Sequence, residues 1–273
     1  MSSLQERLGK IALIGGGQMG EAIVQGLIVG ASFDSAGIAV AEPFEERRNL
    51  LSELYGIQCV PDGAMLDAPD TVIMAVKPQI FREVCQSLVQ AAGFSPQRII
   101  SIAAGVTTSV MLEYFAECAV VRVMPNINLM VSAGMSVVAP AAGTALAEAE
   151  LVVELFGLMG QATLIDESLI DAATAISGSG PAYFALLVEE LVKSAIQVGL
   201  PEATAELLAR QTVIGTGRYL EQRQATTPLE LRTAVTSPNG TTEAAIECFE
   251  AQGFSLVVQN AIYACLRRAV ELG

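Results

Sequence analysis

Short apolar segments rich in β-branched residues alternate with helical segments through the first half of the chain. The apolar segments lie at residues 10–15, 37–42, 71–76, 99–104, 119–124 and 134–139. Nearly continuous apolar character is typical of parallel strands that helices cover on both faces. The pattern therefore predicts an α/β domain with a parallel sheet over residues 1–165.

From about residue 145 onward the apolar residues recur at helical spacing only. Helical segments are expected at residues 151–160, 167–177, 181–199, 201–223, 241–253 and 254–272. Pro181 and Pro201 stand where helices begin, and Gly199 and Gly253 stand where helices end. The second half is thus expected to be an all-α domain, residues 166–273.

Composition adds a prediction about assembly. Apolar residues make up 52% of the chain and charged residues 16%, yet no apolar run reaches the ~20 residues of a membrane span. We therefore expect no membrane contact and burial of the excess apolar surface in a homodimer, with a higher homo-oligomer as an open alternative. The formal charge of −14 argues against a nucleic-acid partner, because phosphate binding requires clustered Lys and Arg.

The cysteine and histidine content bears on the cellular compartment and on the kinds of catalysis that are available. Five widely spaced cysteines form no close pairs, and the N-terminal residues lack the apolar core of a signal peptide. A reducing, cytoplasmic location is expected. The chain has no histidine, which excludes imidazole acid–base catalysis and His-ligated metals; no metal site is predicted.

A glycine motif follows the first predicted strand. Gly15, Gly17 and Gly20 form a G-x-G-x-x-G pattern between the strand at 11–14 and a helical segment at 21–28. In that context the first glycine permits a tight turn, the second lets a pyrophosphate approach the backbone, and the third permits close helix packing. The motif predicts a Rossmann-type dinucleotide site; the alternative is a tight turn in another α/β fold.

The end of the second strand bears on cofactor choice. Glu42 stands about 20 residues past the glycines, where an acidic side chain accepts hydrogen bonds from the adenosine ribose and repels a 2′-phosphate. This favours NADH over NADPH. Arg47 and Arg48 favour the opposite if they bind that phosphate, and a solvated helix face is the alternative reading for both.

Three further strand ends are candidates to flank the nicotinamide, since ligands bind beyond the carboxyl ends of parallel strands. These are residues 75–78, which include Lys77, residues 101–105, and residues 122–126, for which a strand end followed by a proline stop is the alternative. Lys77 is one of three lysines in an acidic chain; a solvated loop lysine is the alternative.

Two segments of the helical half carry candidate chemistry. The small residues at 177–180 precede Pro181 and allow close approach of a cofactor ring or of another backbone. Residues 235–242 gather hydroxyls and free amides at the start of a helix, which predicts a carboxylate site without a cation. Capping of that helix by Thr241 or Thr242 is the alternative.

Taken together, these segments resemble pyrroline-5-carboxylate reductases, from about residue 10 to residue 270. The resemblance is most specific at residues 75–78, 101–105, 177–183 and 228–242. It implies a Rossmann domain, an all-α domain that interlocks with a partner subunit, and reduction of a cyclic imine by NADPH or NADH. By position, the implied cofactor contacts are Gly15, Gly16, Gly17, Gln18, Met19, Glu42, Asp62, Ala75, Val76, Lys77, Pro78, Ala103 and Ala104. The implied substrate contacts are Glu167, Ser237, Gly240, Thr241 and Thr242.

The sequence departs from the family pattern at three places. Ile127 and Asn128 stand where the family usually has Thr-Pro, Asp62 stands where an asparagine is common, and Glu42 stands where many relatives have a small polar residue. The first change affects the geometry beside the nicotinamide, and the last weakens the expectation of NADPH preference.

The resemblance implies hydride transfer to the C=N carbon of 1-pyrroline-5-carboxylate, giving L-proline, with Thr242 as the catalytic residue at the ring nitrogen. Solvent can protonate a small cyclic imine, which suits a chain without histidine. A β-hydroxyacid dehydrogenase is the first alternative, but it needs a lysine early in the central helix, where residues 182–191 hold none. A non-catalytic cofactor-binding protein is the second.

Overall fold

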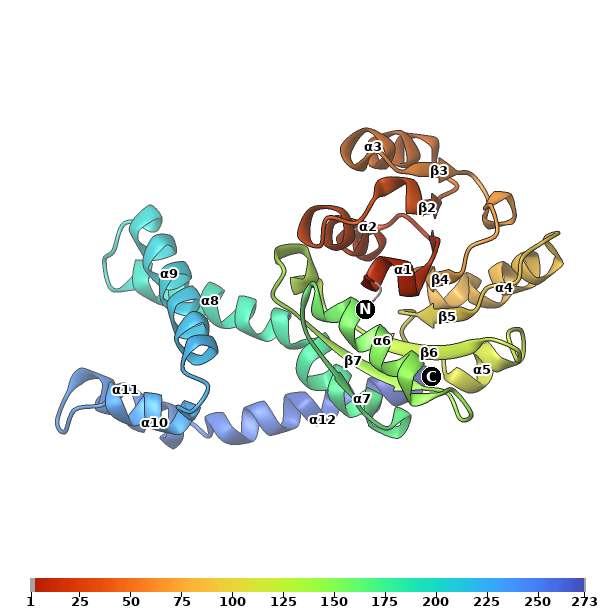
Figure 1. Ribbon diagram of the computed structural model, residues 1–273. Helices are drawn as coiled ribbons and strands as arrows, with labels where there is room; N and C mark the ends of the chain where they lie inside the picture. Colours follow the sequence, from red (N-terminus) through yellow and green to blue (C-terminus); the bar gives the residue numbers. More distant parts are fainter. Residues whose placement is uncertain (1–2, 273) are drawn as a thin grey trace. The chain divides into compact units, whose positions relative to one another are not determined.

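The structure, a computed structural model, describes residues 3–272 and forms two compact units (Figure 1). The first unit runs up to Ser179 and also includes the end of the chain from Cys265, and the second unit is Gly180–Ala264. The domain boundary expected at residue 165 stays a prediction. Packing alone groups residues 166–179 with the first unit, because Ile170 is fully buried against Val137 and Ala139 of the sheet.

The first unit is built on an eight-stranded sheet in the order β3-β2-β1-β4-β5-β6-β7-β8. The strands are β1 Ile11–Ile14, β2 Ile38–Ala41, β3 Gln58–Val60, β4 Thr71–Met74, β5 Arg98–Ser101, β6 Ala119–Met124, β7 Gly134–Pro140 and β8 Gly160–Leu164. All neighbouring strands pair in parallel except β6 and β7. The expected Rossmann-type sheet is confirmed, and its strand order reverses between β1 and β4, where such sheets bind ligands.

The sheet differs from the expectation in three respects. The pattern missed β3 and β8, so the expectation of helices only beyond residue 145 is wrong. Both missed strands lie at sheet edges, where β3 is very short and β8 is only half-buried, so neither has a strong apolar pattern. The pairing of β6 with β7 is antiparallel because residues 125–133 are too short a connection for the crossover that parallel pairing requires.

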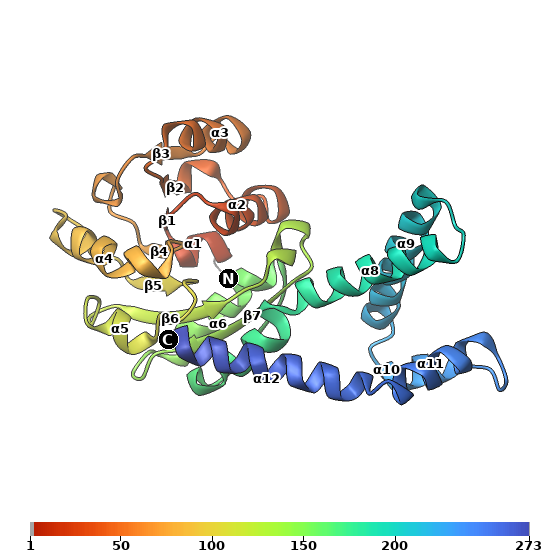
Figure 2. The same ribbon diagram turned by 180° about the vertical axis from the view of Figure 1, so that it is seen from behind.

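Helices cover both faces of this sheet. One face packs on α1 Leu4–Leu8, α2 Gln18–Gln25, α3 Glu45–Tyr55 and α6 Leu146–Gly157; the other packs on α4 Phe81–Gln90 and α5 Thr108–Leu112. Leu13 of β1 faces the first layer, whereas Ala12 and Ile14 face the second, as the two-residue period of a strand requires. Figure 2 shows α6 beside β6 and β7 from behind.

Along the chain between β8 and Gly180, there is a 3-10 turn at Glu167–Leu169, then α7 Ile170–Ala173 and a π-helical segment at Thr174–Gly178. The second unit contains α8 Gly180–Gln197, α9 Glu202–Gln222, α10 Pro228–Ala234, α11 Thr241–Ala251 and the first part of α12 Phe254–Leu272. Gly199 and Gly253 have positive φ angles of 101° and 75° at the ends of α8 and α11, as expected. Within residues 3–272, no helix is both long and apolar enough to cross a membrane.

Candidate functional site

The glycine turn joins β1 to α2, and its glycines have different surroundings. Gly15 has a φ of 106°, and a Cβ added there would lie 2.6 Å from the carbonyl oxygen of Ala75. A Cβ at Gly20 would lie 2.2 Å from the carbonyl oxygen of Gly15. Gly17 instead faces open space and precedes α2 without a side-chain cap. The turn therefore leaves backbone N–H groups at the start of α2 available to an anion.

A cavity of about 760 Å³ lies beside this turn, at the carboxyl ends of β1, β2 and β4. Its lining combines six predicted cofactor residues, Gly15, Gly17, Glu42, Ala75, Val76 and Lys77, with Pro43, Phe44, Glu46, Arg47, Leu50 and Ile80. Cavities of this size are typical of small-molecule sites. The large apolar side chains at its rim suit a flat ring, and the glycine backbone suits a phosphate.

The carboxylate of Glu42 is buried at the end of β2, with 6% of the residue exposed. It accepts hydrogen bonds from the amide of Gly16 at 2.9 Å and from the amide of Phe44 at 3.1 Å. Two backbone donors leave further lone pairs on its oxygens, so the carboxylate retains capacity to accept from ligand hydroxyls.

The guanidinium groups of Arg47 and Arg48 are both bound within the chain. Arg47 donates to the carbonyl oxygen of Gly16 at 2.6 Å and forms an ion pair with Glu21 at 2.5 Å. Arg48 donates to the carbonyl oxygens of Glu42 and Pro43, at 2.9 and 2.7 Å. Neither is the freely solvated side chain of the alternative reading.

The other predicted cofactor residues lie in several places. Gly16 is buried in the turn, Gln18 and Met19 begin α2, Pro78 is exposed after Lys77, and Ala103 is buried after β5. Asp62 does not line the cavity and accepts a hydrogen bond from the amide of Ala64 at 2.9 Å. Ala104 lines a second, smaller cavity.

This second cavity has a volume of about 270 Å³ and a mostly apolar wall. It is lined by Ala104, Gly105, Arg122, Met124, Asp171, Thr174, Ser179, Cys265, Arg268 and Ala269, all in the first unit. It thus joins two of the predicted nicotinamide-flanking segments, the loop after β5 and the end of β6.

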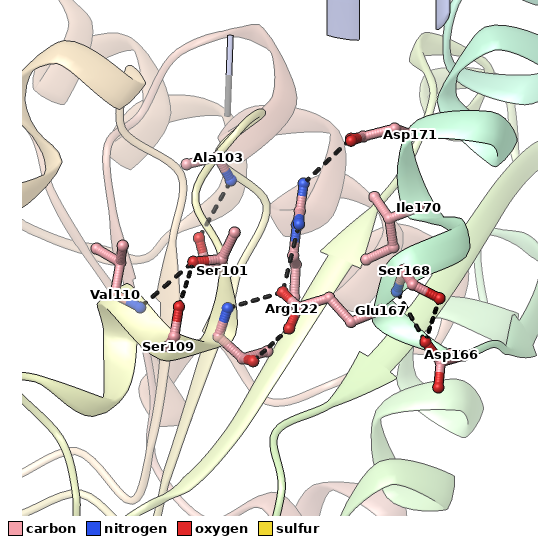
Figure 3. Close-up of polar contacts among 12 residues, drawn as sticks. Ser101, Ala103, Ser109, Val110, Arg122, Asp166, Glu167, Ser168, Ile170 and Asp171 are labelled. Carbon is pink, nitrogen blue, oxygen red and sulfur yellow. Dashed lines mark hydrogen bonds and ion pairs between the residues drawn. The ribbon is translucent and has the colours of Figure 1, made fainter. Parts of the chain in front are cut away.

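A charge cluster surrounds the buried Arg122, which lines the second cavity together with Asp171. Arg122 extends from β6 between Glu167 and Asp171 (Figure 3), at 3.3 and 3.9 Å from their carboxylate oxygens, with 7% of its side chain exposed. Glu167 also accepts a hydrogen bond from the amide of Thr108 at 2.7 Å and one from the Thr108 hydroxyl. The cluster therefore ties β6, the start of α5 and the segment before α8 together.

The sequence predicts Arg122 and Glu167 as separate site residues, and it does not predict the ion pair between them. It missed Thr108 and Asp171 as their partners. The available signal was Arg122 itself, a charged residue inside the apolar strand at 119–124, because a buried charge requires a partner.

Asn126, at the end of the same strand segment, is also held firmly. Its side-chain amide donates to the carbonyl oxygen of Ser177 at 3.0 Å, and its side-chain oxygen accepts from the amides of Asn128 and Met135, both at 3.2 Å. The loop that contains the unusual Ile127 and Asn128 is therefore anchored to the small-residue segment at 177–180.

The predicted substrate loop lies in the second unit, before α11. Gly240 is the N-cap of α11 and no side chain caps it, so the capping alternative for Thr241 and Thr242 is wrong. A Cβ at Gly240 would lie 2.4 Å from the hydroxyl oxygen of Ser237, which lies close over the backbone there. Ser237 and Thr241 are exposed and Thr242 is half-buried at a helix N-terminus that lacks a side-chain cap, which suits an anionic ligand. The carboxylate of Glu243 accepts a hydrogen bond from the amide of Asn239 at 2.6 Å, just before the helix.

Comparison with known proteins gives a consistent result. A family model described as pyrroline-5-carboxylate reductase dimerisation matches residues 167–272, and one described as NADP oxidoreductase, coenzyme F420-dependent, matches residues 10–105. The chain is 36% identical to the pyrroline-5-carboxylate reductase of Synechocystis sp., over 97% of this chain and 98% of that protein. It is 39% identical to the pyrroline-5-carboxylate reductase of Corynebacterium melassecola, over 96% of this chain and 98% of that protein.

Solved structures are similar over the same extent. A pyrroline-5-carboxylate reductase from Coxiella burnetii matches with a TM-score of 0.90 at 33% identity, covering 97% of this chain and 99% of that one. The Plasmodium falciparum pyrroline carboxylate reductase with NADP bound matches with a TM-score of 0.83 at 26% identity, covering 97% and 98%.

Proposed function

The chain belongs to the pyrroline-5-carboxylate reductase family, and we propose that its glycine turn and the adjoining cavity bind the cofactor for reducing 1-pyrroline-5-carboxylate to L-proline. The enzyme is an NAD(P)H-dependent oxidoreductase that acts on a carbon–nitrogen bond. The observation that supports the site most directly is the meeting of the glycine turn, Glu42 and residues 75–77 in one cavity.

The residues present fit a dinucleotide. The open space at Gly17 and the uncapped start of α2 suit the pyrophosphate, and the spare lone pairs of Glu42 suit the adenosine ribose hydroxyls. Phe44, Leu50 and Ile80 supply apolar surface for the adenine. Lys77 provides a cation at the end of β4, and Ala104, after β5, lines the second cavity.

When bound, NAD(P)H supplies the hydride that reduces the C=N carbon of the substrate. The chain contributes orientation and electrostatic complementarity, and no histidine is needed because solvent can protonate a small cyclic imine.

We assign the substrate to the start of α11. The amides of Thr241 and Thr242 and the hydroxyl of Ser237 hold the carboxylate through the helix N-terminus, without a cationic side chain. Gly240 remains a predicted substrate contact, and its amide donates to the carbonyl oxygen of Ser237 at 3.0 Å. The hydroxyl of Thr242 serves the ring nitrogen, which makes Thr242 the catalytic residue. Glu167 remains a predicted substrate contact, and its carboxylate already accepts from Thr108 and contacts Arg122.

We propose that NADH is at least competitive with NADPH. Glu42 places a negative charge at the ribose end of the cavity, where it repels a 2′-phosphate. The two arginines that would offset this charge are bound to backbone carbonyls, and Arg47 is also neutralised by Glu21.

A homodimer formed through the second unit, open to further assembly, is the proposed functional state. Helices of this unit leave large apolar side chains exposed, among them Phe184, Leu186, Leu207, Leu208, Leu256 and Val257. Extended apolar surface of this kind marks an interaction site. All five cysteines are free thiols, in keeping with the proposed cytoplasmic location.

The test of the proposed function is oxidation of NADH or NADPH in the presence of 1-pyrroline-5-carboxylate, with L-proline identified as product. A β-hydroxyacid as the only substrate would contradict the proposal, as would cofactor binding without turnover.

A further inference from the structure

Arg47 connects α3 to the glycine turn by several contacts. Its Nε donates to the carbonyl oxygen of Gly16 at 2.6 Å, and its Nη2 lies 3.5 Å from the carbonyl oxygen of Gly17. The same Nη2 forms an ion pair with Glu21 in the first turn of α2. Only about a quarter of the Arg47 side chain is exposed.

Glu21 is itself fixed from two sides. Its other carboxylate oxygen accepts a hydrogen bond from the hydroxyl of Tyr55, the last residue of α3, at 3.0 Å. Partial burial opposes the charge of Glu21, but the hydrogen bonds from Arg47 and Tyr55 outweigh it and hold the pKa of this carboxyl below its ordinary 4.5. The ion pair with Arg47 is therefore present throughout the neutral pH range.

The two carbonyls that Arg47 contacts belong to peptide units that face the predicted pyrophosphate. A peptide unit is planar and trans, so its C=O and N–H point in opposite directions. Fixing the Gly16 carbonyl consequently fixes the N–H of Gly17. The Gly17 carbonyl, whose direction fixes the N–H of Gln18, accepts from the amide of Glu21 at 2.8 Å, and Arg47 adds the longer contact. The amides of Gly17 and Gln18 are those at the uncapped start of α2.

The turn needs an external constraint because it contains three consecutive glycines. Glycine loses more conformational freedom on ordering than any other residue. A Cβ at Gly16 would lie 2.7 Å from a methyl carbon of Leu51, so a larger residue there would require the Leu51 side chain to move. Hydrogen bonds from outside the turn lower the cost of holding its amides in position.

We propose that Arg47 is a positioning residue that orients the pyrophosphate-binding amides, and that it serves NADH and NADPH equally rather than recognising a 2′-phosphate. This inference rests on the proposed function, since it assumes a dinucleotide at the glycine turn.

The experiment compares four single variants and the Arg47→Met/Glu21→Gln double variant by titration of NADH and NADPH fluorescence, together with KM values. Arg47→Met keeps the apolar stem and removes the donors. Arg47→Lys keeps the charge but lacks the planar guanidinium group whose several nitrogens contact the carbonyls and Glu21. Glu21→Gln removes the charge of the partner, and Arg82→Met removes an exposed ion pair with Glu113 elsewhere in the same unit as a control.

We expect Arg47→Met to raise the Kd of both cofactors by roughly tenfold, as loss of charged hydrogen bonds predicts, with the NADH:NADPH ratio unchanged. The KM for 1-pyrroline-5-carboxylate should stay constant, Arg47→Lys should not rescue binding, and Arg82→Met should resemble the wild type. Glu21→Gln should weaken both cofactors and should add little to Arg47→Met in the double variant.

A loss confined to NADPH would overturn the proposal, because it would make Arg47 a 2′-phosphate ligand. Unchanged affinity in a folded Arg47→Met variant, or additive effects with Glu21→Gln, would also overturn it. If Arg47→Met does not fold, the NADH:NADPH ratio of Kd values in Glu21→Gln tests the proposal by itself. A wild-type protein that binds both cofactors but does not reduce the imine would refute the proposed function and leave this test intact.

Discussion

The carboxylate of Glu42 accepts a hydrogen bond from the amide of Gly16 at 2.9 Å, so the side chain that closes β2 also holds the glycine turn of β1. Its position in the cavity, where we propose that the adenosine ribose binds, and its role in the turn are therefore linked. A change at Glu42 should alter both cofactor choice and the stability of the turn.

Glu42→Ser should shift the ratio of specificity constants toward NADPH by about tenfold, or about 1.4 kcal/mol, because the charge that repels a 2′-phosphate is removed. Steady-state kinetics with both cofactors measure this ratio. Glu42→Gln is the matched control: it keeps the size of the side chain, and its shift should have the same direction. An unchanged ratio in both variants would show that Glu42 does not select the cofactor.

Gly17→Asp should weaken binding of both cofactors by roughly a hundredfold, because it places a negative charge where the pyrophosphate approaches. The variant should still fold, since Gly17 faces open space. Gly17→Ala is the control, because its φ of −66° suits any residue and it adds no charge. Full cofactor affinity in a folded Gly17→Asp variant would place the pyrophosphate elsewhere.

Thr242→Ala and Thr242→Val should each lower turnover by roughly ten- to a hundredfold, or about 1.4–2.7 kcal/mol, with cofactor binding unchanged. The thermal unfolding midpoint should change little, because the N-cap of α11 is Gly240 and no side chain caps the helix. Thr233→Val is a control in α10, where the hydroxyl only bonds its own helix. Wild-type turnover in both Thr242 variants would remove Thr242 from the catalytic site.

Arg122→Met should reduce the free energy of unfolding by about 2–3 kcal/mol, because it leaves the carboxylates of Glu167 and Asp171 without their buried cation. Urea unfolding followed by circular dichroism measures the loss. Arg7→Met breaks the exposed pair with Glu154 and should cost less than about 1 kcal/mol. Equal, small losses in both variants would mean that the Arg122 cluster does not stabilise the fold.

The wild-type protein should sediment as a dimer or larger assembly at micromolar concentration. Phe184→Asp, which charges an exposed apolar position of α8, should lower the sedimentation coefficient and the activity together. Val29→Asp, equally exposed on the first unit, should leave the assembly intact. A fully active monomer at that concentration would contradict the proposed homodimer.

Local sequence patterns were enough to predict several parts of the molecule. Continuous apolar strands and helical periodicity predicted the sheet and the helical second half, and the spacing of Gly15, Gly17 and Gly20 predicted a strand–turn–helix. Glu42 and residues 75–77 were expected at the carboxyl ends of their strands, and they share a cavity there. These features depend on interactions over a few residues or on the fixed direction of parallel strands.

Which side chains contact one another depends on how the elements pack in the fold. The edge strands β3 and β8 have weak apolar patterns, and the antiparallel pairing of β7 depends on the length of a loop. From the sequence, Arg47 could be either a ligand of the 2′-phosphate or a solvated side chain. Its contacts with Gly16 and Glu21 exist because α3 packs beside the turn. Ion pairs between residues far apart in the chain carry no periodicity, so only the packed fold reveals them.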